Sequence, residues 1–111
     1  MLEGIKRDPD LQVLAVINTT RPLTSTVPAI IDHVRSLGRV DGLINNTHLG
    51  AGTTAGVIQS GAALVTAAAR ELAIPVVATV VMAELAPLIG DHDREGNPVR
   101  KIHRYMPQAF W

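Results

Sequence analysis

The chain has 111 residues, a length that predicts one small domain and excludes a two-domain enzyme. Ten basic and ten acidic residues give a formal net charge of zero, so the sequence lacks the excess of positive charge by which proteins bind nucleic acid or an anionic membrane. Because there is no cysteine, a disulfide framework, a thiolate metal site and a cysteine nucleophile are excluded.

The hydrophobic composition indicates a folded protein with an aliphatic core. Hydrophobic residues make up 47% of the chain but aromatic residues only 3%, and a core of Val, Ile, Leu and Ala is typical of a parallel sheet covered by helices. The longest apolar run, residues 72–83, is interrupted by Pro75 and is too short to cross a bilayer. The first ten residues lack the apolar stretch of a signal peptide, so we expect a cytoplasmic protein without a membrane span.

The first half of the chain predicts a strand, a helix and a second strand. Residues 11–18 are apolar almost throughout, which predicts a buried central strand because no alternation leaves one face polar. The cap-forming residues 24–26 precede a helix over residues 27–37, whose apolar positions recur at helical spacing and which ends before Gly38. Residues 42–46, with the sequence GLINN, then form a short strand.

The second half predicts a long helix followed by two more strands. The long helix runs from Thr53 or Thr54 to about Ala73, and its stripe of small residues, which includes Gly61, permits close approach to a sheet. The remaining expected elements are a third strand over 74–81, one or two helical turns over 82–89, a solvated turn over 91–98 and a fourth, edge strand over 99–106.

The alternation of strands and helices predicts the fold class. Right-handed crossovers make the first three strands parallel. The expected fold is therefore a three-layer α/β domain with a mostly parallel sheet. The chain would form a single partial domain over residues 1–111, about half of a doubly wound domain.

Ligands of such sheets bind at the carboxyl ends of the strands. Asn45 ends the second strand, where its amide offers one donor and one acceptor that match the edge of a purine. The alternative is a turn residue bonded to its own backbone, and we expect Asn45 to lie past the strand, so that its replacement spares the fold. Asn18 occupies the equivalent position after the first strand. Arg21 follows in a loop, where it either meets a phosphate or an acidic partner or lies at the surface.

The loop GAGTTA, residues 50–55, matches the glycine pattern of a dinucleotide-binding turn. The acidic residue that would hold the ribose is missing from its expected place near Val81 and Met82, so we favour a flexible loop capped by Thr53 or Thr54. No Lys follows the glycines, which excludes a phosphate-binding P-loop at this position.

The titratable residues show no spacing typical of a metal site. The four histidines are scattered, at positions 33, 48, 92 and 103. The acidic cluster Asp91, His92, Asp93 and Glu95 is expected to form a charged surface turn. His48 lies beside the strand-end asparagines, where it is either a general base or, as we favour, a cap on a backbone carbonyl.

Two strand-end motifs carry a family resemblance. The segments VINTTRPLTSTVPAIIDHV, GLINNTHLGAGTTAGVIQSG and LAIPVVATVV, with the terminal YMPQAFW, resemble the C-terminal half of MinD/ParA-like P-loop ATPases, the CobQ/CobB/MinD/ParA nucleotide-binding family. The resemblance rests on Asn, two residues, Arg and Pro after one strand and on NNTHL after the next. It covers residues 11–84 well and the tail more loosely.

The resemblance implies that the chain binds ATP or ADP by contacts to the adenine base. It implies that Asn45 reads the base, that Asn46, Asn18 and Arg21 also belong to the site, and that Val81 and Glu84 close over the other side of the ring. The sequence contains no Walker A loop, which belongs to the missing N-terminal half together with the Mg²⁺ site. We therefore expect no ATP hydrolysis by this chain alone, whether it is a gene fragment or a half that has lost catalysis.

The same residues leave two alternative functions open and also predict how the chain associates. A small Rossmann-like interaction module that binds no nucleotide is the first alternative, and a fragment of a dinucleotide-binding oxidoreductase is the weaker second. The first strand needs a partner for its outer edge. That partner is expected to be the missing half or, for the isolated chain, a second copy in a homodimer, with poor solubility as the other outcome.

Overall fold

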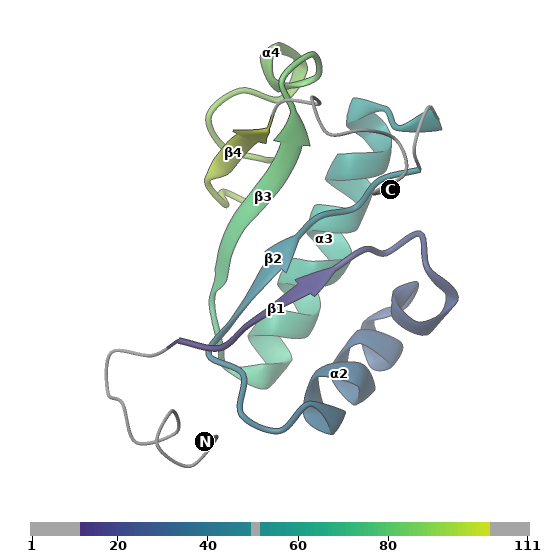
Figure 1. Cartoon of the computed structure of the whole chain (residues 1–111), viewed down its shortest axis with the longest axis vertical. Coiled ribbons are helices and arrows are strands. Elements are labelled where there is room, and N and C mark those ends of the chain that lie inside the picture. The colour runs from purple at the N-terminus through teal and green to yellow at the C-terminus, as the bar shows by residue number, and fades with distance from the viewer. Residues whose placement is uncertain (1–11, 50–51, 103–111) are drawn as a thin grey trace.

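A four-stranded parallel sheet organises the molecule. The structure is a computed structural model that describes residues 12–49 and 52–102 (Figure 1). The strands lie side by side in chain order, all parallel: β1 (Leu14–Ile17), β2 (Gly42–Asn45), β3 (Val76–Met82) and β4 (Val99–Ile102). The connections contain the 3-10 turn η1 (Pro22–Thr24) and the helices α2 (Val27–Ser36), α3 (Ala55–Leu72) and α4 (Ala86–Ile89). The expected α/β class with a parallel sheet is confirmed.

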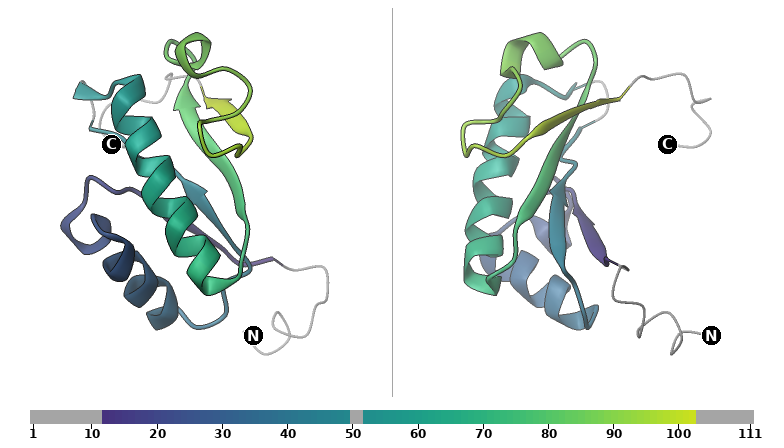
Figure 2. Two further views of the ribbon diagram at one scale, coloured as in Figure 1. Left: turned by 180° about the vertical axis from the view of Figure 1, so that it is seen from behind. Right: turned by 90° about the vertical axis from the view of Figure 1, so that its left-hand side faces the viewer.

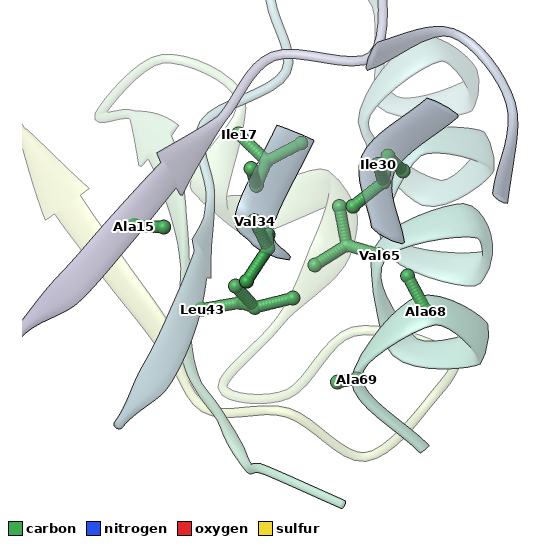
Figure 3. Close-up of a cluster of buried hydrophobic side chains, with 8 residues drawn as sticks. All are labelled: Ala15, Ile17, Ile30, Val34, Leu43, Val65, Ala68 and Ala69. Carbon is green, nitrogen blue, oxygen red and sulfur yellow. The ribbon is translucent and has the colours of Figure 1, made fainter. Parts of the chain in front are cut away.

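Helices α2 and α3 pack side by side on one face of the sheet, as the right-hand view in Figure 2 shows. This follows from the strand order, because right-handed crossovers that advance in one direction place their helices on the same side. The main core lies between these layers (Figure 3) and contains Ala15, Ile17, Ile30, Val34, Leu43, Val65, Ala68 and Ala69. Of the three expected layers, the described residues thus form two, the sheet and one layer of helices.

Within the described residues strand β1 lies at the edge of the sheet, which agrees with the expectation that its outer edge lacks a partner in this chain, but it is not buried on both faces as predicted. Ala15 and Ile17 are buried beneath the helices, whereas Leu14 and Val16 are exposed, Val16 by 58%. The apolar run over residues 11–18 therefore does not mean that both faces of the sheet are covered at β1. On the face opposite the helices, a side chain at Gly42 would meet both Leu14 and Val77, and Val77 is also exposed. The described residues leave this apolar face without a helical cover.

Helix boundaries agree closely with the sequence prediction because their capping signals are local. The Thr54 side chain accepts a hydrogen bond from the Val57 N–H at 3.2 Å and begins α3. The Thr26 side chain begins α2 in the same way through Ala29. Ala73 ends α3 in the left-handed conformation, with a φ of 59°.

Several predicted features fall on residues that the structure does not describe. They are Gly50 and Ala51 of the glycine-rich loop, His103 and the rest of the predicted fourth strand beyond Ile102, and the C-terminal tail. Among the described residues, none of the helices is long and apolar enough to span a membrane.

Asp41 joins the start of β1 to the start of β2. Its carboxylate accepts a hydrogen bond from the Val13 N–H at 2.8 Å, and its own N–H donates to the Val13 carbonyl at 2.7 Å. The Val13 N–H, together with the hydrogen bond and charge of Arg39, holds the pKa of Asp41 below its ordinary value despite an opposing effect of burial. Ionised Asp41 therefore stabilises the folded state.

We expect Asp41→Asn to lower the Tm at pH 7, because the lost carboxylate no longer fixes the Val13 N–H. A carboxyl group with a depressed folded-state pKa stabilises the protein above its unfolded pKa of about 4, and this contribution disappears as the pH falls through the lower folded pKa. Thermal unfolding of both proteins across this range should show the difference in Tm shrinking in acid. The exposed Asp32, changed to Asn, is the control for charge alone. A difference that persists unchanged in acid would contradict this account.

Candidate functional site

The carboxyl ends of β1 and β2 form one polar edge. Ile17 pairs with Asn45 in parallel register, and the Asn46 N–H donates to the Ile17 carbonyl at 2.8 Å. The Asn18 side chain then joins the two following loops, since it accepts from the His48 N–H and donates to the His48 carbonyl, both at 3.3 Å. The structure therefore brings together the segments after the first two strands, as predicted.

Asn45 belongs to the interior of the protein. It is the last residue of β2 and is fully buried. Its amide donates to the Ile58 carbonyl at 3.4 Å and to Thr79 Oγ1 at 3.3 Å, and its Oδ1 accepts from Thr47 Oγ1 at 2.6 Å. The expectation that Asn45 lies past the strand was wrong, because the ladder and its buried partners include it. The role of Asn45 in reading a base stays a prediction.

Asn46 and Arg21 are the predicted site residues at the ends of β1 and β2 whose side chains are open to a ligand. Asn46 follows the end of β2 and is half-buried. Arg21 is exposed in the loop after β1. Within residues 12–49 and 52–102, neither the Asn46 amide nor the Arg21 guanidinium has a hydrogen-bond partner.

An open pocket of about 520 Å³ lies at the free edge of β1. Its lining consists of Val16, Asn18, Arg21, Pro22, Leu23, Thr24 and His33. Arg21 supplies a permanent positive charge to this lining. The apolar side chains can pack on a flat ring, and Arg21 can pair with an anionic group.

The two site residues predicted after the third strand lie in different surroundings. Val81 is buried within β3 and packs with Ile58 and Ala86 in a second, smaller core. Glu84 is exposed in the turn after β3. In the described part of the chain, no hydrogen bond joins either side chain to the loops after β1 and β2.

The histidines take separate places, and no group of three or more His, Cys, Asp or Glu among the described residues could hold a metal ion. His33 lines the pocket, and His92 forms a short antiparallel bridge with Pro98. His48 contributes its backbone N–H and carbonyl, not its ring, to the bonds with Asn18.

The turn before β4 contains a buried carboxylate, that of Asp93. The prediction of a solvated turn was therefore wrong for Asp93. Asp93 is only 6% exposed. Its carboxylate accepts from the backbone N–H groups of Glu95 and Asn97, from the Asn97 side chain at 3.1 Å and from Thr79 Oγ1 at 2.5 Å. One feature of the sequence pointed to these bonds around Asp93, since Thr79 is the only hydroxyl residue in the apolar strand β3.

No protein-family model, curated protein or solved structure matches the chain.

Proposed function

We propose that this chain is the base-binding, C-terminal part of a MinD/ParA-like domain that binds an adenine nucleotide. The site would lie at the carboxyl ends of β1 and β2. Asn46 would read the base, Arg21 would contact a phosphate, and Asn18 would hold the two loops together. The proposal rests first on the family resemblance of the strand-end motifs.

The observation that carries the proposal is the pair of open polar groups at one sheet edge. The Asn46 amide offers a donor and an acceptor, the combination that the edge of adenine requires. In the described residues this amide has no competing partner, whereas the amides of Asn18 and Asn45 are engaged. Ligands of open parallel sheets bind outside the carboxyl ends of the strands, which is where Asn46 and Arg21 lie.

The uncovered surfaces of the sheet also favour a domain completed by further chain. Among residues 12–49 and 52–102, strand β1 has a neighbour on one side only, and Leu14, Val16 and Val77 are exposed on the face that no described helix covers. An unpaired parallel edge beside an apolar face is unusual in a complete domain, because parallel sheets are normally covered on both faces. The missing half of the ATPase domain would pair with β1 and cover this face.

Among the described residues, no group of three or more His, Cys, Asp or Glu side chains could hold a metal ion. Phosphoryl transfer in such domains depends on a Walker A loop, which the sequence does not contain. The proposed role is nucleotide binding alone.

We expect Asn46→Ala to weaken binding of a fluorescent ATP analogue by the completed domain. A lost hydrogen bond to the base costs about 1–3 kcal/mol, roughly 5- to 150-fold in Kd. The titration compares wild type, Asn46→Ala and Ser60→Ala, an exposed substitution on α3 that serves as the control. An unchanged Kd for Asn46→Ala, with adenine still preferred over guanine, would refute this role of Asn46.

The DNA upstream of the Met1 codon provides a second test. An in-frame Gly-Lys-Thr loop roughly 120–140 residues earlier, a distance set by typical domain sizes, would support the ATPase half. An upstream region without such a loop would favour a small interaction module without nucleotide. Exposed Leu14, Val16 and Leu23 around the edge of β1 are the observation in favour of that second function. A chain that binds no nucleotide and stays a monomer in light scattering would support it further.

A further inference from the structure

A line of hydrogen bonds crosses the carboxyl end of the sheet. It begins at Thr19 after β1, whose Oγ1 lies 3.2 Å from Thr47 Oγ1, and continues from Thr47 to Asn45 Oδ1 at 2.6 Å. From there the Asn45 amide donates to Thr79 on β3 at 3.3 Å, and Thr79 donates to Asp93 at 2.5 Å. The line therefore joins both loops of the candidate site to a carboxylate beyond β3.

The chemistry of Asp93 sets the direction of this line. An ionised carboxylate only accepts hydrogen bonds, so the Thr79 hydroxyl must donate to it and can accept from the Asn45 amide. The Asn45 Oδ1 then faces Thr47, whose hydroxyl donates to it. Thr47 Oγ1 in turn accepts from the Thr19 N–H at 3.2 Å and can accept from its hydroxyl. The Ile58 carbonyl, also only an acceptor, supports the same orientation of Asn45.

The line is protected from water. Asn45 and Thr79 are fully buried, Thr47 is 2% exposed, and Asp93 is 6% exposed. In the described part of the chain Asp93 has no ion pair. Hydrogen bonds to a charged group are stronger than those between neutral groups, and burial strengthens them further because the local dielectric constant is low. The bond from Thr79 to Asp93 thus fixes the buried end of the line.

We propose that Asp93 is a positioning residue for the candidate site. Through Thr79 and Asn45 its carboxylate holds Thr47, and with it the backbone that carries Asn46, against the loop after β1. Its importance for a ligand rests on the proposed nucleotide function, but the coupling along the line does not. Asp93 acts on the site without touching the ligand.

The test is a comparison of amide NMR spectra of the 111-residue chain. Asp93→Asn removes the charge and keeps the shape, so it should shift the side-chain NH₂ signal of Asn45 and the backbone amides of Thr19 and Thr47. In a Thr79→Val background the same change should leave these signals in place. The amides of Glu95 and Asn97, which bond to Asp93 directly, should still move in both backgrounds.

Thr79→Ser is the rescue variant, because it keeps the hydroxyl that Val lacks. In that background Asp93→Asn should again shift the amide signals of Thr19 and Thr47. If Asp93 only shaped its own turn, these shifts would not depend on the hydroxyl of residue 79. If Thr79→Val fails to fold, the wild-type and Ser backgrounds still decide the question. Unchanged Thr19 and Thr47 signals on Asp93→Asn in either background would overturn the proposal.

Failure of the nucleotide proposal would look different. An Asn46→Ala protein with an unchanged Kd would refute base reading and leave the coupling between Asp93 and Thr19 intact. Loss of that coupling, with Asn46→Ala still weakening binding, would remove the positioning role of Asp93 alone.

Discussion

Replacement of Gly61 by Ala should destabilise the protein strongly. Gly61 lies in the middle of α3 and is buried against the loop after β2. An added Cβ would stand 2.6 Å from Thr47 Cβ and 2.9 Å from Thr47 Cγ2, and still nearer to its hydroxyl oxygen. The nearest atoms belong to a short, fully engaged side chain, so neither helix nor loop can give way cheaply.

Overpacking of this kind costs about 1–3 kcal/mol. For a domain of this size each kcal/mol lowers the Tm by roughly 4–8 °C, so a fall of roughly 5–20 °C is expected. Thermal unfolding followed by circular dichroism measures it. The matched control is Gly56→Ala on the same helix, where the nearest atom to a new Cβ is 3.7 Å away; there Ala should be neutral or stabilising by up to about 1 kcal/mol. Equal effects of the two changes would contradict the close contact at Thr47.

The sequence predicted the elements that local chemistry determines. The side chains of Thr26 and Thr54 cap the two long helices, and Gly38 follows α2 with the positive φ that was predicted, so the helix boundaries lie within one residue of those expected. The stripe of small residues on α3 was also informative, since Gly61 permits a close approach, although to Thr47 in the loop after β2 and not to a strand. These signals operate within a few residues of one another and need no knowledge of the fold.

The place of β1 in the sheet could not be predicted in this way. An apolar run shows that a strand can be covered on both faces, but its neighbours are chosen by residues far away in sequence. In the part of the chain that the structure describes, β1 pairs only with β2, and its outer face is exposed at Leu14 and Val16. The apolar run of β1 therefore indicates the surface that a further part of the domain is proposed to cover.

The buried polar groups show the same limit. Asn45 bonds Thr79, which follows it by 34 residues, and Thr79 bonds Asp93. No spacing within a single element announces such a network, and the charged turn around Asp93 has the composition of an exposed loop. The sequence therefore predicted that the segments after β1 and β2 meet, but not the side chains that hold them from inside.

Asn45→Ala should lower stability, and Asn46→Ala should not. The first change deletes a fully buried amide and its hydrogen bonds to Thr47, Thr79 and the Ile58 carbonyl. Loss of these bonds, at about 0.5–1.5 kcal/mol each, together with the small cavity that remains, should lower stability by about 2–4 kcal/mol.

Urea unfolding of the two variants separates stability from binding at neighbouring positions. Asn46 is half-buried and its amide has no partner among the described residues, so its change to Ala should stay within about 0.5 kcal/mol of wild type. The expected pattern is a lower urea midpoint for Asn45→Ala and a weaker nucleotide affinity, at normal stability, for Asn46→Ala. The reverse pattern, in which Asn45→Ala folds normally and loses only nucleotide binding, would assign base recognition to Asn45. It would also mean that the bonds of Asn45 to Thr47 and Thr79 add little to the fold.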